Sequence, residues 1–367
     1  MIKRDQEKTY PCLQKNIKFL TENSHEVVNR CNEQGIEVAG VVKGVCGDLR
    51  CAEAMLAGGV KQIASSRIEQ IIGFKNAGID SDTLLLRTPM RTEIPDVIKH
   101  VDISLNSEIE VLCELNSEAE KQGKVHNVIL MKDVGDLREG FFDDYEIIEA
   151  CKLVENKLNS LHLYGIGTNV GCYGSLLPTH GKLQELVEIV EKIESIIGRR
   201  LQCISGGATS SYMRVLDGDM PERINHLRIG ENILLAFDLP HLYGYEQPSM
   251  HKDAFVLLGE VIEVKDKPSK PVGETAFDAF GRKKVYPDFG VRKRAIVAMG
   301  RCDIGDFTNV FPKIEGVKAI GDSSDHLILD IEESQEIIKV GDILSFDVNY
   351  GGLMYASSSQ SVSSEYI

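Results

Sequence analysis

The feature that most constrains the fold is an alternation, from about residue 36 to residue 235, between short apolar runs and longer amphipathic ones. The short runs are mostly β-branched or leucine-rich and are apolar at successive positions, which is typical of strands covered on both faces in a parallel sheet. Between them, residues 107–123, 145–160 and 182–198 carry apolar side chains at three- and four-residue steps, which predicts helices. The eight strand-like runs are 36–43, 61–66, 82–88, 101–107, 125–133, 161–169, 201–207 and 226–230.

Eight strands alternating with helices predict an α/β fold whose N-terminal part, residues 16–235, is a parallel (β/α)8 TIM-type barrel. A doubly wound open sheet is the competing arrangement, because the number of strands does not establish closure. After about residue 236 the strand-like runs are separated by Gly, Pro and Asp turns, which predicts a mainly-β domain over 236–367. The segment 1–15 is a candidate additional strand of that β domain.

Composition excludes several classes of protein. The chain of 367 residues carries a formal net charge of −15 and no long Lys/Arg run, which argues against a nucleic-acid partner. No apolar run approaches the roughly 20 residues that cross a bilayer, and no signal-peptide stretch is present, so we expect no membrane partner and a cytoplasmic location. The nine cysteines lack CxxC pairs, which indicates reduced thiols rather than disulfides or a zinc site.

Unusual residues follow the predicted strands at the ends that line the active-site mouth of a barrel. Lys43 ends the first run, behind an apolar strand. Burial there lowers the pKa of a lysine amine and makes imine formation possible, although a lysine that merely extends into water is the simpler interpretation. The fifth run leads into a charged, glycine-rich loop with Arg138, and the sixth leads into Asn169 and further glycines.

The last two strands of the predicted barrel end in a candidate phosphate site. The turn from Ser205 to Thr209 combines Gly207 with hydroxyl groups and presents backbone N–H groups to an anion, at the position where barrels commonly bind phosphate. Arg228 follows on the eighth run, as a ligand-binding residue or as part of a structural ion pair. Together with Lys43, this turn predicts pyridoxal 5′-phosphate as the cofactor. P-loop, dinucleotide and HExxH motifs are absent, and no metal site is expected.

The order and spacing of these motifs resemble the fold-type III pyridoxal-phosphate amino-acid racemases, which are alanine racemase-like, and most closely the ornithine racemase branch. The segments that carry the resemblance include VVKGVCG, VGDLREGFF, GIGTNVGCYG, ISGGATSS and LRIGE. The resemblance implies that Lys43 holds the cofactor as a Schiff base and acts as acid and base on one face of the substrate. It further implies that Arg138 contacts the phenolic oxygen of the cofactor, that Asn169 lies against the ring in place of a histidine, and that Arg228 faces the pyridine nitrogen. The phosphate would be bound by Ser205, Gly207, Thr209 and Tyr366.

The second proton-transfer group is where the sequence departs from this family. Alanine racemases use a tyrosine from the partner subunit's β domain, and the corresponding stretch 272–280 contains no tyrosine. Asp278 falls closest to that position and would need burial to raise its pKa, although a turn aspartate is a comparable interpretation. Asp325, Cys172 and Tyr173 are the alternatives. The resemblance also implies a homodimer whose sites are completed by the partner chain.

The predicted function is therefore racemisation of an amino acid by two-base proton transfer at Cα, with ornithine as the favoured substrate. Glu139 and Glu231 are candidate residues for attracting a substrate ammonium group. Two alternatives remain: a pyridoxal-phosphate-binding homeostasis protein without turnover, and a pyridoxal-phosphate-dependent D-amino-acid lyase or aldolase. The β domain after the barrel favours an enzyme over the first alternative, and the lack of a His/Cys cluster argues against the second.

Overall fold

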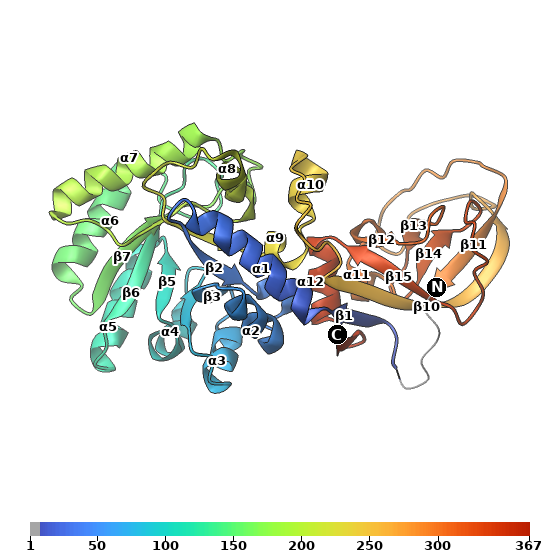
Figure 1. Ribbon diagram of the computed structural model, residues 1–367, viewed down its shortest axis with the longest axis horizontal. Helices are drawn as coiled ribbons and strands as arrows, with labels where there is room; N and C mark the ends of the chain where they lie inside the picture. The colour runs from blue at the N-terminus through green and yellow to red at the C-terminus, as the bar shows by residue number, and fades with distance from the viewer. Residues whose placement is uncertain (1–7) are drawn as a thin grey trace. The chain divides into compact units, whose positions relative to one another are not determined.

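The computed structural model of the protein describes residues 8–367. The described residues divide into two compact units, one formed by Lys18–His251 and the other by residues 8–17 together with Lys252–Ile367. Figure 1 labels the helices and strands of both units, which are described separately below. None of the helices among residues 8–367 combines the length and the apolar character that a membrane span requires.

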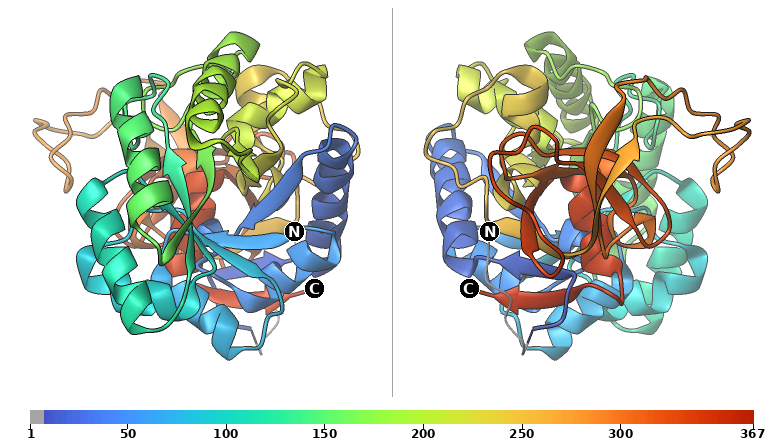
Figure 2. Two further views of the ribbon diagram at one scale, coloured as in Figure 1. Left: turned by 90° about the vertical axis from the view of Figure 1, so that its left-hand side faces the viewer. Right: turned by 90° about the vertical axis from the view of Figure 1, so that its right-hand side faces the viewer.

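The larger unit is a closed barrel of eight strands, each parallel to its neighbours, with β9 pairing back onto β2. This closure confirms the predicted TIM-type barrel and excludes the doubly wound open sheet. Helices surround the strands on the outside (Figure 2, left). The strands are β2 (Glu37–Val41), β3 (Gln62–Ser65), β4 (Asp82–Leu85), β5 (Ile103–Asn106), β6 (His126–Met131), β7 (Leu161–Gly167), β8 (Cys203–Ser205) and β9 (His226–Ile229).

Local sequence signals begin and end the helices of this unit. In α7, for example, the Thr179 side chain accepts a hydrogen bond from the Lys182 N–H at the start, and Gly198 takes a left-handed φ of 75° at the end. The full set is α1 (Ile17–Asn32), α2 (Leu49–Ala57), α3 (Ile68–Asn76), α4 (Ile94–His100), α5 (Ile109–Lys121), α6 (Asp144–Lys157), α7 (His180–Ile197), α8 (Tyr212–Asp217), α9 (Glu231–Leu234) and α10 (Asp238–Tyr243), with 3-10 turns η1 (Lys43–Val45), η2 (Arg91–Glu93) and η3 (Thr209–Ser211).

Apolar side chains from most of the strands form the inner part of the barrel core. Residues such as Val41, Leu84, Ile129 and Met131 pack in one buried cluster. Burial of each such side chain stabilises the fold by roughly 1.5–3 kcal/mol relative to exposure. The barrel is therefore rigid at its centre, and the chain segments that follow the strands are free to carry polar and charged groups at its mouth.

The smaller unit is mainly β, as expected, and its principal sheet has the order β12-β15-β10-β11-β14-β13. The N-terminal strand β1 (Cys12–Lys15) pairs antiparallel with β10 and parallel with β16. The other elements are β10 (Phe255–Pro268), β11 (Val291–Val297), β12 (Val310–Pro312), β13 (Lys318–Asp322), β14 (Leu327–Asp330), β15 (Ile343–Val348), β16 (Ser363–Tyr366), α11 (Arg301–Ile304), α12 (Tyr350–Ser358) and η4 (Phe307–Asn309).

Candidate active site

Lys43 begins the turn η1, directly after the buried strand β2. Burial lowers the pKa of its ammonium group; the nearby charge of Cys172 raises that pKa, and the guanidinium groups of Arg138 and Arg228 lower it further. Lys43, Arg138 and Cys172 follow strands β2, β6 and β7, and Arg228 lies on β9, so the fold brings four separate segments to one mouth. A lowered pKa increases the fraction of neutral amine near neutrality, which is the form that attacks a carbonyl carbon.

The turn after β8 has the form of an anion cradle. Gly207 adopts a φ of +120°, and a Cβ added there would lie 2.5 Å from the Ser211 Oγ. The Asn232 N–H, which follows β9, points to the Thr209 Oγ1 at 3.4 Å, so the turns after β8 and β9 lie side by side. This close approach of backbone and hydroxyl groups explains why a glycine occupies position 207.

A chain of buried hydrogen bonds holds Arg228 next to Ser205, the residue that ends β8 before the turn with Gly207. The Arg228 guanidinium donates to the Ser205 Oγ and, at 2.7 Å, to the Thr168 carbonyl. The Ser205 hydroxyl lies 2.7 Å from the His226 Nδ1, and the His226 Nε2 lies 3.2 Å from the Gln62 Oε1. Burial and the neighbouring Arg228 lower the pKa of His226 to about 3, so its ring is neutral. A neutral ring that donates from Nε2 to Gln62 accepts at Nδ1 from Ser205, which leaves the Ser205 oxygen free to accept from Arg228.

Arg138 and Glu139 lie together in the loop after β6. The two side chains form a bidentate ion pair through the Arg138 Nε and Nη2 atoms. The Glu139 carboxylate also raises the pKa of both Lys43 and Arg228, so its charge acts on the barrel mouth. Glu231 is directed elsewhere, because its Oε1 accepts from the Phe237 and Asp238 N–H groups at 2.9 Å each.

Cys172 and Tyr173 belong to the loop after β7 and are both exposed. The charge of Cys172 acts on Lys43, Arg138 and Arg228. The exposed fraction of Tyr173 is 70%, so its phenol lies largely in solvent. The structure thus brings Cys172 together with Lys43 and does not enclose Tyr173.

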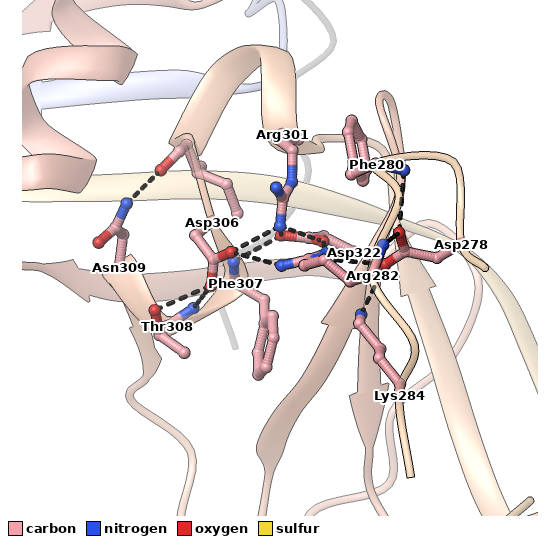
Figure 3. A network of polar contacts seen from close by, with 11 residues as sticks. Asp278, Phe280, Arg282, Lys284, Arg301, Asp306, Phe307, Thr308, Asn309 and Asp322 are labelled. Atoms are coloured by element: carbon pink, nitrogen blue, oxygen red, sulfur yellow. Dashed lines mark hydrogen bonds and ion pairs between the residues drawn. The ribbon is translucent and has the colours of Figure 1, made fainter. Parts of the chain in front are cut away.

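Asp278, Asp325 and Tyr366 belong to the smaller unit. The Asp278 carboxylate accepts from the Phe280 and Arg282 backbone N–H groups and from the Arg282 Nε, as Figure 3 shows. These hydrogen bonds lower the pKa of Asp278, whereas its predicted role as a base needs a raised pKa. Asp325 is exposed in the turn between β13 and β14, and Tyr366 ends β16 with the Lys15 ammonium 5.4 Å from its ring centre.

Two residues at this site were missed from the sequence. His226 lies two positions before Arg228 on β9, and the two-residue period of a strand places both side chains on the same face, which was a usable signal. Asp136 was read only as part of a charged loop, although its side chain is 99% buried, with an exposed fraction of 1%. Nothing local to the sequence indicated its partners, which lie 35–40 residues away.

The residues present fit pyridoxal phosphate. Three buried polar atoms around the cradle have no hydrogen-bond partner among the described residues: the Thr168 Oγ1, the Asn169 Nδ2 and the Ser211 Oγ. Arg228 is 4% exposed, and no carboxylate of residues 8–367 pairs with it within ion-pair distance. Unsatisfied buried donors beside an uncompensated cation favour an anionic group such as a phosphate ester, and Lys43 supplies the amine that an aldehyde needs.

Comparison with known proteins places these observations in context. Residues 16–236 match the family described as alanine racemase, N-terminal domain. The chain is 38% identical to an ornithine racemase of Acetoanaerobium sticklandii, over 98% of this chain and 100% of that one. It is also 38% identical to a lysine racemase of Thermotoga maritima, over 97% and 98% of the two chains. Among solved structures, an alanine racemase of Streptomyces lavendulae shares the fold with a TM-score of 0.74 at 15% identity, covering 99% of this chain and 98% of that one.

Proposed function

We propose, from the premise that the chain belongs to the alanine racemase family of pyridoxal-phosphate-dependent amino-acid racemases, that it interconverts L- and D-ornithine. The observation that carries this proposal is the buried Lys43 amine, which shares a barrel mouth with the phosphate cradle and with an acidic side chain, Glu139. The two relatives at 38% identity are named for ornithine and lysine, and both of these amino acids carry an ammonium group at the end of the side chain.

The residues that would hold the cofactor are Lys43, Arg138, Asn169, Ser205, Gly207, Thr209, Arg228 and Tyr366. When bound, pyridoxal phosphate withdraws electrons from the substrate Cα and so makes its proton acidic. The permanently charged Arg228, held by Ser205 and Thr168, disfavours a proton on a neighbouring ring nitrogen. His226 and Gln62 keep Ser205 oriented toward Arg228, so the neutral histidine contributes to the site without touching substrate.

Proton movement at Cα requires one group on each face. We assign one face to the Lys43 Nζ, because its lowered pKa increases the share of neutral amine that is able to take a proton. We assign the other face to the Cys172 Sγ, because Cys172 lies in the loop after β7 at the barrel mouth and is among the neighbours of Lys43. Asp278, Asp325 and Tyr173 stay as alternative predictions, and the hydrogen bonds from Arg282 make Asp278 a weaker base than the role needs.

The Glu139 carboxylate is our candidate for binding the side-chain ammonium of the substrate. Its charge acts on Lys43 and Arg228, and 23% of its side chain remains exposed, so a ligand has access to it. Glu231 is the weaker candidate because burial raises the pKa of its carboxyl group. Its Oε1 atom is also already occupied, since it accepts hydrogen bonds from two backbone N–H groups at the start of α10.

A substrate screen in deuterium oxide tests the proposed function. Each L- and D-amino acid is incubated with the purified enzyme and pyridoxal phosphate, and both deuterium at Cα and the hand of the product are measured. We expect exchange with inversion for ornithine, at a higher kcat/KM than for lysine or alanine. Exchange with inversion only for another amino acid would contradict the ornithine assignment, and cleavage products would indicate a lyase.

Glu139→Gln tests whether Glu139 binds the side-chain ammonium of the substrate. Activity is compared between ornithine and norvaline, which has the same carbon chain without the side-chain ammonium, so that a general loss of activity affects both alike. Loss of one charge-assisted contact predicts that the preference for ornithine over norvaline falls about tenfold. Loss of the Arg138 ion pair affects both substrates equally and cancels in this ratio. An unchanged ratio would remove Glu139 from substrate recognition.

The second base is tested by Cys172→Ser and Asp278→Asn, assayed from each enantiomer separately. If Cys172 serves one face, Cys172→Ser slows deuterium uptake from one enantiomer far more than from the other, while cofactor absorbance is unchanged. Asp278→Asn should then take up deuterium at nearly the rate of the unmodified enzyme from both enantiomers. Slow uptake from one enantiomer in Asp278→Asn, with normal rates in Cys172→Ser, would identify Asp278 as the second base instead.

We also propose that the enzyme is a cytoplasmic homodimer, with a cofactor-binding barrel over 16–235 and a β domain over 236–367 joined by the segment 1–15. The family resemblance and the apolar side chains exposed in the loop after β10, such as Val272, Phe277 and Phe289, support a partner subunit. Sedimentation over a range of protein concentrations tests the dimer, and a monomer at all concentrations would contradict it.

A further inference from the structure

Asp136 joins two loops at the barrel mouth. It lies in the loop after β6, and its carboxylate accepts four backbone N–H groups from the loop after β7. Strands β6 and β7 are neighbours in the barrel (Figure 1). The distances to its oxygens are 2.9 Å from the Gly171 nitrogen, 3.3 Å from Cys172, 3.0 Å from Tyr173 and 3.4 Å from Leu176. One side chain therefore satisfies four backbone donors of a loop that has no regular secondary structure of its own.

The backbone of both loops is shaped for this contact. Gly171 has a φ of +84°, and a Cβ added to Gly174 would lie 2.6 Å from the Asp136 carbonyl oxygen. On the other side, the Asp133 Oδ1 accepts from the Gly135 and Leu137 N–H groups and fixes the turn that presents Asp136. A side chain at position 174 would push against the Asp136 backbone and separate the loops, so the two loops pack as a single unit around the carboxylate.

Asp136 remains a carboxylate over the working range of pH. Burial alone would raise its pKa, but the four N–H groups that it accepts hold the pKa below the ordinary value. The charged carboxylate is the stronger acceptor. An asparagine amide has one acceptor oxygen, and its NH2 group is itself a donor, so it cannot satisfy all four backbone N–H groups.

The loops that Asp136 joins carry two residues that are neighbours of Lys43, Arg138 and Cys172. Arg138 follows Asp136 by two positions, and Cys172 is one of the four residues that donate to the carboxylate. We propose that Asp136 is a positioning residue of the racemase: it fixes the loop of residues 171–176 against the loop of residues 133–140 and so holds the Cys172 thiol and the Arg138 guanidinium at the mouth beside Lys43. Its importance for turnover rests on the proposed function; the attachment of the loops does not.

Asp136→Asn in the cofactor-loaded enzyme tests this inference. Release of the loop should raise the rate at which the amides of Gly171, Cys172, Tyr173 and Leu176 exchange with deuterium by about tenfold, because these N–H groups lose the carboxylate that accepts from them. Peptide mass spectrometry follows this loop separately from the rest of the chain. We further expect kcat for the amino-acid substrate to fall about tenfold or more while KM changes less, because misplacement of proton-transfer groups affects the chemical step.

Asp102→Asn is the matched control, because Asp102 accepts the Thr83 N–H at 2.8 Å and the Lys75 ammonium at 2.6 Å at the opposite end of the barrel. We expect it to lower stability without changing amide exchange at residues 171–176. Equal exchange of this loop in Asp136→Asn and the unmodified enzyme, or faster exchange with unchanged kcat, would overturn the proposal.

Hydrogen exchange provides the test if Asp136→Asn does not fold. In the unmodified enzyme, the amides of Gly171, Cys172, Tyr173 and Leu176 should exchange more slowly than those of Gly174 and Ser175 in the same loop. Uniformly fast exchange across the loop would overturn the attachment. Slow exchange in a protein that racemises no amino acid would support the attachment while contradicting the proposed function.

Discussion

At the scale of single residues, the site depends on charges that are placed where water is largely excluded. Lys43 loses part of its affinity for a proton to burial, and Arg228 keeps its charge in a buried position through hydrogen bonds to Ser205 and Thr168. The two side chains therefore differ in whether they can give up a proton. A lowered pKa makes the neutral lysine amine more available for proton transfer, whereas an arginine remains a fixed positive charge.

Lys43→Ala is the most direct prediction at this scale. We expect purified enzyme to absorb in the visible range when cofactor is bound through Lys43, and we expect this band to be lost completely in Lys43→Ala. Lys124→Ala, which removes an ammonium that donates to the Ile98 and Lys99 carbonyls, is the control and should retain the band. Absorption spectra decide the matter, and a Lys43→Ala protein with the full band would contradict the assignment.

At the scale of elements, the short turns after the strands determine what the barrel can bind. The barrel strands end after three to seven residues, and the turn after β8 then reverses the chain tightly enough to bring Gly207 against Ser211. Neighbouring turns share hydrogen bonds, as between Thr209 and Asn232. The binding surface is therefore a property of adjacent turns, and one altered turn changes the whole surface.

Gly207→Ala tests the cradle at this scale. Its φ of +120° and the 2.5 Å contact with Ser211 lead us to expect a Kd for pyridoxal phosphate that is about tenfold higher or more, since such strain costs on the order of 1–3 kcal/mol. Gly218→Ala is the matched control: Gly218 has a left-handed φ of +69°, but nothing lies within 4 Å of an added Cβ. Cofactor titration followed by absorbance should show weaker binding only in Gly207→Ala.

At the scale of the whole molecule, buried histidines couple folding to pH. Burial lowers the pKa of His126 to about 4 and that of His226 to about 3, from an ordinary value of 6.5. The folded protein therefore binds fewer protons than the unfolded chain between pH 6.5 and about 4. The free energy of unfolding is therefore highest above the pKa of the unfolded histidines and decreases as the pH falls from 6.5 toward 4.

Urea unfolding at several pH values, with cofactor saturating, checks this prediction. Each histidine should reduce the free energy of unfolding by about 1.4 kcal/mol for every pH unit below the unfolded value. His126→Gln should remove one histidine's share of the slope, whereas His25→Gln at an exposed position should leave the slope unchanged. A stability that does not vary between pH 6.5 and pH 4.5 would contradict the two low pKa values.

The order of strands and helices and most of the residues at the barrel mouth could be predicted from the sequence, whereas closure of the barrel rests on the pairing of β9 with β2. Strand and helix periods are local properties, and so are the glycine-rich turn around Gly207 and the position of Lys43 after an apolar run. Each of these features depends on residues within a few positions of one another, which a sequence pattern reveals. The resemblance to known racemases added roles for these residues, because the order of several such motifs is more specific than any one of them.

Tertiary structure alone decided which polar groups act together. The His226 contact with Gln62 spans 164 residues, and Asp136 accepts from a loop 35–40 residues away. Hydrogen bonds of this kind depend on the distance between side chains after the barrel has closed, and no local period encodes that distance. The same reason explains why the sequence proposed Asp278 as a base without showing that Arg282 holds its carboxylate in the charged form.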